Sequence, residues 1–371
     1  MIHPQERYKL LNTENVISPS LLVYPDIIEY NIQLMIKIAG GSNFLRPHIK
    51  THKIGEIIQL QLAYGITKFK CATIAEAELL AQCNVKDILL AMQPVGANVA
   101  RFFTLLKQYP NSKFSTIIDN TASLKEIAHL ASSKNIKIPI WLDVNCGMDR
   151  TGIIPDEKAV KLYKSIDDNP NLCAEGLHAY DGHIHDSNYA LRKEKCDVSF
   201  NTVLQLKKEI EKLGVSVKNI VAGGSPTFPI HAQRENVETS PGTPLLWDQG
   251  YSDNYPDLPF IPAAILFTRV VSKPRPNTIC LDLGHKAVAS EMPLPRIKIL
   301  DRNTLEQIGQ SEEHLVIKCQ DTSKYNIGDS FYAIPIHICP TVAKYNDVLT
   351  VVDGTVTGSW KVAARDHKIS I

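Results

Sequence analysis

The chain has 371 residues, of which 44% are hydrophobic and 21% charged, with a formal net charge of +1. A balance this close to neutral provides no bulk field for nucleic acid or anionic lipid, so neither is an expected partner. No apolar run approaches the roughly 18 residues of a membrane span, and residues 1–7 lack a signal-peptide core. The eight cysteines include no CxxC pair. We therefore expect a cytoplasmic protein with reduced thiols.

Strand-like and helical patterns alternate over residues 18–239. Strands are expected at 18–24, 44–50, 68–71, 87–92, 113–119, 137–144, 172–180, 217–222 and 236–239. Helices are expected at 25–39, 53–64, 74–82, 99–108, 120–133, 156–166 and through 203–213. Eight strands from 44–50 onward, most of them separated by helices, predict a closed (β/α)8 barrel of TIM type. The rival, an open doubly wound sheet, would need a glycine-rich turn after its first strand, and none is present.

After about residue 259 the helical periodicity disappears. Short strands are expected at 263–271, 278–282, 297–300, 314–319, 330–334 and 348–352, with glycines in some of the turns. We therefore expect an α/β barrel over residues 20–258. The C-terminal all-β domain would comprise residues 259–371, together with residues 1–19.

The segment Arg46-Pro-His-Ile-Lys-Thr-His-Lys53 joins an expected strand to a helix. In such barrels the active site lies at the carboxyl ends of the strands, where a lysine amine can form a Schiff base with a carbonyl. A basic surface loop is the plain alternative. Polar side chains stand at the other strand ends too: Thr73, Gln93, Asp119, Asn145, Asp149, Arg150, His178, Tyr180, His183 and His185.

A glycine turn, Gly223-Gly-Ser-Pro-Thr227, follows the expected strand 217–222. Most turns of this kind are plain turns, but their backbone N–H groups can cradle a phosphate, with the Ser225 and Thr227 hydroxyls donating. Together with the strand-end lysine, the turn matches the requirements of pyridoxal phosphate. The aldehyde would sit on Lys50, the phosphate on Gly223 and Gly224, and the electron-withdrawing ring between them.

His337 and Cys339 stand two residues apart, so on a strand their side chains would share one face. Imidazole and thiolate together favour zinc, and two protein ligands would leave positions open for water and substrate. A buried histidine and a buried cysteine are the usual explanation of such a pair. Pro335 and Pro340 interrupt strand pairing and make a rigid exposed loop plausible.

Six segments, in this order, resemble one family: Arg46–Lys53, Asp143–Gly152, Gly223–Pro229, Ser240–Thr243, Asp282–Lys286 and His337–Val342. It is the D-threonine aldolase and D-serine dehydratase group of fold-type III pyridoxal-phosphate enzymes, which are related to alanine racemase. The resemblance covers about residues 18–360. It implies a barrel plus a β domain, a homodimer, and a small D-amino acid as substrate.

The resemblance also implies roles for individual residues. Lys50 would hold the cofactor, with His48 nearby. Arg150 would approach the cofactor's phenolic oxygen and keep it ionised by its fixed charge. Tyr180 matches the position beside the pyridine ring, although a core tyrosine is an alternative, and Tyr251 would reach the phosphate.

A divalent metal, zinc first and manganese or magnesium otherwise, would bind His337 and Cys339 and contact the substrate's β-hydroxyl. In the aldolase reaction His185 or His183 removes the hydroxyl proton, and the substrate splits into glycine and an aldehyde. In the dehydratase reaction Lys50 takes the Cα proton, and the products are a keto acid and ammonia.

The choice between the two lyases depends on a few positions near the end of the chain. Cys339 matches the dehydratases, where the aldolases carry aspartate, while Pro340-Thr-Val342 and Tyr345 match the aldolases. We favour the aldolase. An amino-acid racemase would need bases on both faces of Cα and no metal. A non-catalytic pyridoxal carrier would leave the second domain unexplained.

Overall fold

The computed structural model describes residues 6–302 and 304–371. These form two compact units. The barrel unit comprises Leu34–Lys50, Ile58–Gly242 and Asp366–Ile371, and the β unit comprises the described residues up to Gln33, Thr51–Ile57 and Thr243–Arg365. The domain bounds expected from the sequence stay a prediction, and residues 1–5, within the expected 1–19 segment, lie outside the described part. In the described ranges, no helix has the length and apolar character needed to cross a membrane.

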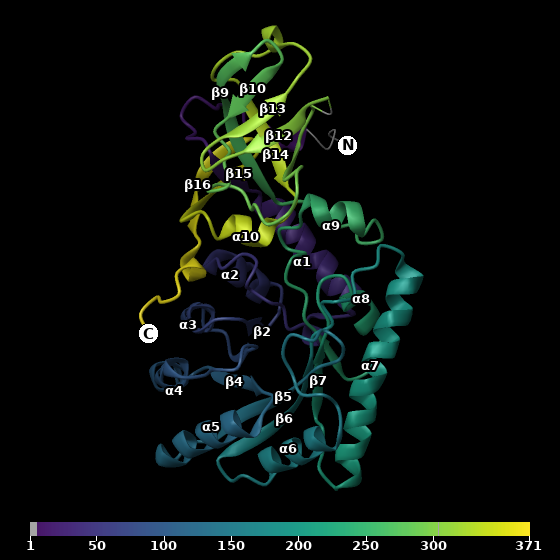
Figure 1. Cartoon of the computed structure of the whole chain (residues 1–371). Coiled ribbons are helices and arrows are strands. Elements are labelled where there is room, and N and C mark those ends of the chain that lie inside the picture. The colour runs from purple at the N-terminus through teal and green to yellow at the C-terminus, as the bar shows by residue number, and fades with distance from the viewer. Residues whose placement is uncertain (1–5, 303) are drawn as a thin grey trace. The chain divides into compact units, whose positions relative to one another are not determined.

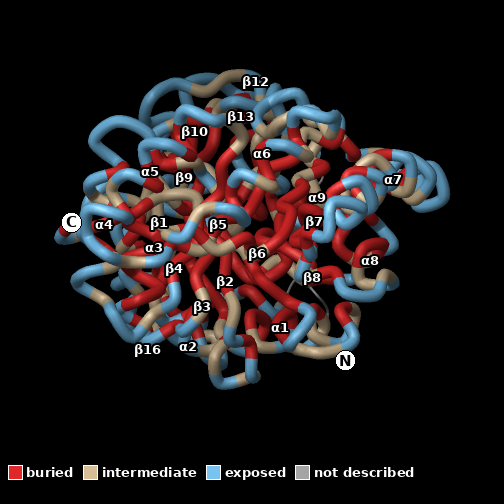
Figure 2. Tube along the Cα trace, turned by 90° about the horizontal axis from the view of Figure 1, so that it is seen from below, coloured by how far each residue is buried: buried red, intermediate tan, exposed pale blue. Residues whose placement is uncertain are grey.

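Seven parallel strands form the sheet of the barrel unit in chain order (Figure 1). They are β2 (Lys68–Cys71), β3 (Asp87–Leu90), β4 (Lys113–Ile118), β5 (Ile138–Val144), β6 (Leu172–Ala179), β7 (Asn219–Ala222) and β8 (Val237–Thr239). Their residues are mostly buried, as the red strands in Figure 2 show. Because consecutive parallel strands need crossovers, helices separate most of them.

The helices of the first part of the chain are α1 (Pro25–Ala39), α2 (Gly55–Ala63), α3 (Ile74–Gln82), α4 (Ala97–Gln108), α5 (Thr121–Ser133), α6 (Glu157–Asp167), α7 (Tyr189–Lys212) and α8 (Phe228–His231). Local capping sets several of their starts. The Thr73 hydroxyl accepts the Glu76 N–H, and the Glu76 carboxylate accepts the Ala72 N–H in return. Asn120 caps α5, as predicted, by accepting the Ser123 N–H. These polar caps satisfy N–H groups that the helix itself leaves unbonded.

Residues 45–49 join the two edges of the parallel sheet. Leu45 forms a parallel bridge with Thr239 of β8, and His48 forms one with Lys70 of β2. The His48 N–H also donates to the Pro241 oxygen at 2.8 Å. The segment thus occupies the eighth position, and the prediction of a TIM-type barrel with a C-terminal β domain is confirmed.

The prediction of one continuous strand over 44–50 is wrong. Residues Ser42–Phe44 form a 3-10 turn, and the bridges at Leu45 and His48 are isolated. Pro47 has no N–H to donate, so it interrupts the ladder, although its carbonyl still accepts the Lys70 N–H at 2.9 Å.

Charged side chains fill part of the barrel interior near this closure. Arg46 is 2% exposed and donates to Glu238 at 2.7 Å and to Asp87 at 2.6 Å. Lys68 also donates to Glu238, and the Arg46 guanidinium lies 5.5 Å from the centre of the Trp141 ring. Burial alone would raise the pKa of Asp87, but the hydrogen bond and charge of Arg46 lower it. This buried cluster links residues 45–49 to β3 and β8.

The β unit contains a nine-stranded, largely antiparallel sheet in the order β12-β13-β10-β9-β1-β15-β16, with β14 pairing β9 and β11. Its strands are β1 (Ser20–Val23), β9 (Ala264–Arg275), β10 (Thr278–Leu281), β11 (Ile297–Ile299), β12 (Glu306–Gln310), β13 (Leu315–Lys318), β14 (Ser330–Pro335), β15 (Asp347–Val352) and β16 (Thr355–Lys361). Its helices are α9 (Gln249–Asn254) and α10 (Ile338–Val342). The sequence did not predict β12, β16, α9 or α10.

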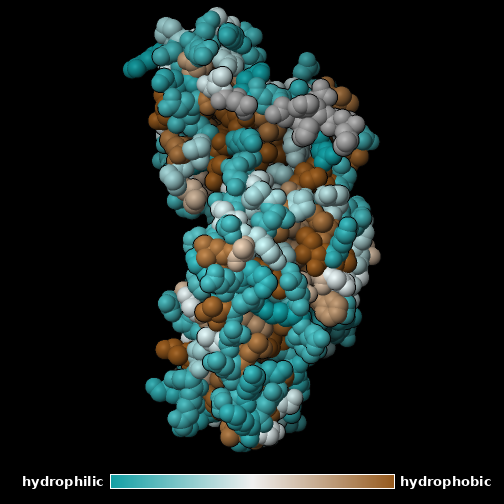
Figure 3. All heavy atoms as spheres, turned by 90° about the vertical axis from the view of Figure 1, so that its right-hand side faces the viewer, coloured by the Kyte–Doolittle hydropathy of each residue, from teal (hydrophilic) through white to brown (hydrophobic). Residues whose placement is uncertain are grey.

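The long helix α7 buries one of its faces. Figure 3 shows the face on which α7 lies, where hydrophilic side chains predominate between smaller hydrophobic patches. The buried residues of α7 include Phe200, Val203, Leu206 and Ile210, at the three-to-four-residue spacing that the sequence indicated. The apolar stripe of the helix therefore faces the core.

Replacing Arg46 by leucine is expected to destabilise the barrel unit by about 3–5 kcal/mol, because the partly buried Asp87 loses its hydrogen-bonded partner and Glu238 keeps only Lys68. The urea unfolding midpoint measures this. Lys161→Leu, which removes only an exposed ion pair with Glu157, is the control and is expected to leave the midpoint unchanged. An Arg46→Leu midpoint equal to that of the control would contradict the structural role of the cluster.

Candidate active site

The aromatic ring of Tyr180 is the point at which the predicted cofactor residues meet. Tyr180 directly follows β6, at the carboxyl edge of the sheet. The Lys50 Nζ lies 5.9 Å from the ring centroid, and the Arg150 Cζ lies 4.8 Å from it. A Cβ placed on Gly224 would lie 3.0 Å from the Tyr180 Cε2, so the ring packs closely against the glycine turn. The structure thus brings together the lysine, the arginine and the glycine turn.

The loop that carries Arg150 is held by polar groups at neighbouring strand ends. The Asn145 side chain accepts the N–H groups of Gly147 and Asp149, both at 3.1 Å. The Asp119 carboxylate accepts the Gly152 N–H at 3.1 Å, and Gln93 in turn accepts the Asp119 N–H. These strand-end residues therefore order the loop.

The glycine turn is a close-packed cradle. Gly223 has φ +84°, and a Cβ there would lie 2.7 Å from the His231 ring, so only glycine fits without displacement. The Thr227 hydroxyl accepts the Gly224 N–H at 3.1 Å and donates to Asp181 at 2.8 Å. Ser225 accepts the Gly242 N–H at 3.3 Å. The turn is therefore ordered, because the Ser225 and Thr227 hydroxyls already form hydrogen bonds with neighbouring protein groups.

Asp181, Cys196 and His231 form a buried group whose ligand-type atoms lie close together. The His231 Nε2 lies 2.8 Å from Asp181 and 3.4 Å from the Cys196 sulfur. Burial, followed by the charge of Asp181, raises the pKa of the Cys196 thiol to about 12, so without a metal this thiol stays protonated. Arg234 contacts both His231 and Cys196 and already supplies a positive charge. We therefore interpret the group as a hydrogen-bonded support of the glycine turn.

The two candidate base histidines differ in environment. His183 is half-buried, and its Nδ1 has no hydrogen-bond partner among the described residues. Its ring packs at Gly147, where a Cβ would lie 2.8 Å from the His183 Nε2. His185 is exposed. His48 accepts the Lys50 N–H at 3.2 Å and so shapes the turn that carries the lysine.

A chain of buried polar groups lies inside the barrel, and the sequence analysis missed most of it. The Lys70 Nζ is 3.5 Å from the His178 Nε2, and the His178 Nδ1 is 2.7 Å from Asp143. Lys70 also lies 5.9 Å from the centroid of the Tyr180 ring. A lysine on the buried face of a predicted strand was the signal that could have identified it.

His337 and Cys339 lie in the β unit, at the start of a helix. His337 is the N-cap residue of α10, and Cys339 is in its first turn, so their predicted placement on a strand is wrong. Burial alone would lower the pKa of His337, but Cys339 and Glu291 raise it to about 9. Burial would likewise raise the pKa of the Cys339 thiol, and the bond to His337 outweighs this and lowers it. The two side chains therefore interact directly.

The surroundings of this pair suit a metal site. Glu291 lies 2.5 Å from the His337 Nδ1, an arrangement in which a carboxylate orients the imidazole and leaves Nε2 for a metal. The Cys339 sulfur lies 3.2 Å from the Thr51 hydroxyl and 3.7 Å from the Thr243 hydroxyl. Thr51 is the residue that follows Lys50 in the chain.

Asp248 anchors the turn that carries the pair. One of its oxygens accepts the Ile338 N–H at 3.0 Å, and the other caps α9 through the Tyr251 N–H at 2.8 Å. Burial raises the pKa of Asp248 to about 6, although these two hydrogen bonds oppose the shift. The Tyr251 ring packs against Trp247, with centroids 5.0 Å apart. Its predicted contact with the phosphate stays a prediction.

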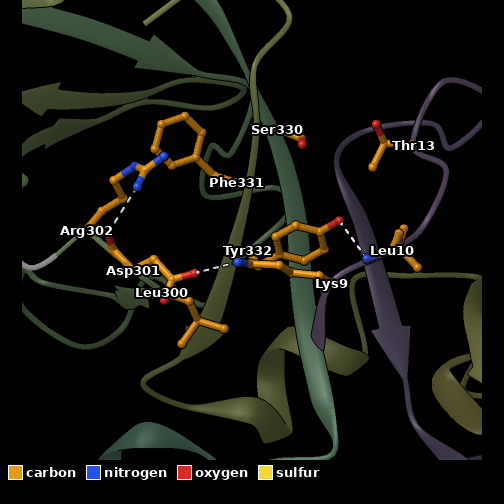
Figure 4. Close-up of a pocket in the computed structure, with 9 residues that line it drawn as sticks. All are labelled: Lys9, Leu10, Thr13, Leu300, Asp301, Arg302, Ser330, Phe331 and Tyr332. Atoms are coloured by element: carbon orange, nitrogen blue, oxygen red, sulfur yellow. Dashed lines mark hydrogen bonds and ion pairs between the residues drawn. The ribbon is translucent and has the colours of Figure 1, made fainter. Parts of the chain in front are cut away.

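A separate cavity of about 320 Å³ lies in the β unit (Figure 4). Its lining residues are Lys9, Leu10, Thr13, Leu300, Asp301, Arg302, Ser330, Phe331 and Tyr332. Lys9 pairs with Asp301 at 3.5 Å, and the Tyr332 hydroxyl accepts the Leu10 N–H at 3.0 Å. None of the predicted site residues lines this cavity.

Comparison with known families gives two consecutive matches. Residues 23–246 match the model described as "Alanine racemase, N-terminal domain", and residues 263–351 match a "Putative serine dehydratase domain". A D-threonine aldolase of Arthrobacter sp. is 26% identical, with 94% of this chain and 92% of the relative covered. A D-serine dehydratase of Dictyostelium discoideum is 25% identical, with 94% and 96% covered.

Solved structures share the fold. A D-threonine aldolase from Filomicrobium marinum superposes with a TM-score of 0.86 at 24% identity, covering 94% of this chain and 95% of that one. A cysteine-to-alanine variant of D-threo-3-hydroxyaspartate dehydratase, in the metal-free form, gives 0.82 at 18% identity, covering 94% and 97%. The chain belongs to the alanine racemase N-terminal domain family, within the D-threonine aldolase and D-serine dehydratase group that its motifs resemble.

Proposed function

We propose that this chain is a pyridoxal-phosphate- and metal-dependent lyase that cleaves D-β-hydroxy amino acids to glycine and an aldehyde. The main observation behind the proposal is that the Lys50 amine and the Arg150 guanidinium both lie close to the Tyr180 ring. This ring in turn packs against Gly224. The full-length D-threonine aldolase relative supports the reaction type.

The barrel unit has groups suited to each part of the cofactor. Gly223 and Gly224 belong to a close-packed turn at the end of β7 whose hydroxyls are already oriented, and a strand-end turn of this kind suits a phosphate. Lys50 would hold the aldehyde carbon, and Arg150 the phenolic oxygen. When bound, pyridoxal phosphate supplies a ring that withdraws electrons from the substrate's Cα.

The chain's own groups then have separable tasks. The Arg150 charge is fixed, so it favours an ionised oxygen next to it at any working pH. His183 is our first candidate for the base that takes the β-hydroxyl proton, because its buried Nδ1 has no partner among the described residues. His185, which is exposed, is the second candidate.

His337 and Cys339 would hold the metal, which would polarise the substrate's β-hydroxyl as a Lewis acid. Zinc suits this imidazole–thiolate pair best, with manganese or magnesium as alternatives. The Glu291 contact and the lowered pKa of the Cys339 thiol support the assignment. The metal-free dehydratase variant that lacks a cysteine is consistent with a metal site containing cysteine in that relative.

A D-serine dehydratase is the second candidate, because Cys339 is a cysteine and a full-length D-serine dehydratase is a relative. It would release pyruvate and ammonia from D-serine, with Lys50 taking the Cα proton. A homodimer, which light scattering would detect, is part of the proposal. A cytoplasmic location is supported by eight cysteines that are all free thiols.

Incubation of the purified protein with D-threonine is expected to yield glycine and acetaldehyde, and D-serine is expected to yield little pyruvate. Lys50→Ala should lose the visible absorption of the cofactor and about 1,000-fold or more of the activity. Lys50→Arg, which keeps the charge but cannot form the imine, should do the same. Pyruvate as the main product would favour the dehydratase, and activity retained in both variants would overturn the role of Lys50.

Gly223→Ala is expected to weaken pyridoxal phosphate binding by about tenfold or more, because the added Cβ would displace His231 and the turn. Gly214→Ala is the matched control. Gly214 has a similar φ of +78°, but a Cβ there would meet nothing within 4 Å. Both variants should lose about 1 kcal/mol of stability from backbone strain, and Gly223→Ala should lose more because its Cβ meets the His231 ring. Only Gly223→Ala should change the cofactor affinity. Equal cofactor affinities of the two variants would contradict phosphate binding at this turn.

His337→Ala and Cys339→Ala are expected to lose the bound metal, measured by elemental analysis of purified protein, and the activity. Cys173→Ser, which changes a half-buried thiol of the barrel unit, should keep both. Metal binding must displace the proton on His337, whose pKa is raised to about 9, so the metal affinity should rise with pH up to that value. A full metal content in His337→Ala would contradict the assignment.

A further inference from the structure

Lys70 is a buried amine to which the proposed reaction assigns no task. Lys68 and Lys70 are two residues apart on β2, so both side chains point into the barrel. Lys68 pairs with Glu238 at 2.5 Å. Lys70 is 3% exposed and has no ion-pair partner in residues 6–302 or 304–371. A buried ammonium without a carboxylate partner is costly, so its retention in the barrel indicates a task other than stability.

The hydrogen-bonding group that faces the Lys70 amine, His178, is itself oriented. His178 and Asp143 are cross-strand neighbours on β6 and β5, and the Asp143 carboxylate lies 2.7 Å from the His178 Nδ1. The carboxylate keeps the proton on Nδ1, which leaves the Nε2 lone pair for Lys70. Burial lowers the pKa of His178 despite the opposing bond to Asp143, so the imidazole is neutral and accepts from Lys70.

The second partner of Lys70 is the ring that Lys50 also faces. Each Nζ lies 5.9 Å from the Tyr180 centroid, and the Arg150 guanidinium lies over the same ring. A tyrosine face attracts cations, and here it gathers three of them. Of the three, Lys50 is the residue that would be joined to the cofactor.

Several charges act on Lys70 from the elements around it. Burial and then the charge of Lys50 lower its pKa to about 7, with a smaller lowering contribution from Arg46, while Asp143 and Asp181 oppose the shift. The Lys70 amine is therefore charged at and below about pH 7. Lys50 acts on it through its charge, which is the largest influence after burial.

We propose that Lys70 is a positioning residue that acts through Lys50: its ammonium, held by His178, repels a proton on the Lys50 nitrogen. The inference rests on the proposed role of Lys50. When the Lys50 amine condenses with an aldehyde, a C=N bond forms and water leaves. The nearby positive charge then lowers the pH at which the C=N nitrogen loses its proton. A second cation beside a reactive lysine is an established way to keep that lysine's nitrogen unprotonated.

The test is a pH titration of the visible absorption of the protein loaded with pyridoxal phosphate. Lys70→Met removes the charge at similar length and is expected to raise the midpoint by about one pH unit. Lys70→Arg keeps a permanent charge and should leave the midpoint at or below that of the unchanged protein. Lys68→Met is the matched control on the same strand and face, and should not move it.

Thermal unfolding of each variant shows whether a changed titration midpoint comes from the lost charge or from a damaged fold. If Lys70→Met does not fold, Lys70→Gln replaces it, because the amide can still donate to His178 while carrying no charge. A midpoint in the neutral variant equal to that of the unchanged protein overturns the inference. Absence of the visible band from the unchanged protein would instead overturn the proposed role of Lys50. The two failures are therefore distinguishable.

Discussion

Backbone hydrogen bonds from residues 45–49 to both edges of the parallel sheet hold the chain where Lys50 emerges. The Arg46 and His48 N–H groups donate to the carbonyl oxygens of Thr239 and Pro241, and the Ile49 N–H donates to Lys70. Pro47 limits this segment to isolated bridges, but the segment still forms backbone hydrogen bonds to both edges of the sheet. The closure places Lys50 at the carboxyl edge of the sheet, where barrel enzymes carry their chemistry.

The electrostatic character of the site follows from how its charges are paired. The carboxylates of Asp143 and Asp181 each form a hydrogen bond with a buried histidine, so both carboxylates already have partners within the protein. Within the described residues, the cations around the Tyr180 ring have no carboxylate at hydrogen-bonding distance, although Lys70 faces His178. A site of this kind favours a ligand with several negative groups, as a phosphorylated cofactor with a phenolic oxygen has.

In the β unit, too, a buried carboxylate forms hydrogen bonds within the protein. A single buried carboxylate, Asp248, accepts backbone N–H groups from the starts of two helices and so fixes the turn that presents His337 and Cys339. Glu291 then orients the imidazole. A metal pair on a short turn needs such support, because two ligands alone do not hold their own geometry.

The sequence by itself determined most strands and helices of the barrel unit, the change to a mainly β region after residue 259, and the strand-end positions of Tyr180 and the glycine turn. It placed Lys50 after a strand that exists only as isolated bridges. Periodicity and strand-end position are local properties, so they can be read from the residues. Only the tertiary structure decided that Lys70 faces Tyr180, that Asp143 orients His178, and that Glu291 and Asp248 support His337 and Cys339, the proposed metal ligands. The hydrogen-bonded partners among them are separated in the chain by 35 to 108 residues. No local pattern marks them, because packing of distant elements, and not spacing along one element, brings such groups together.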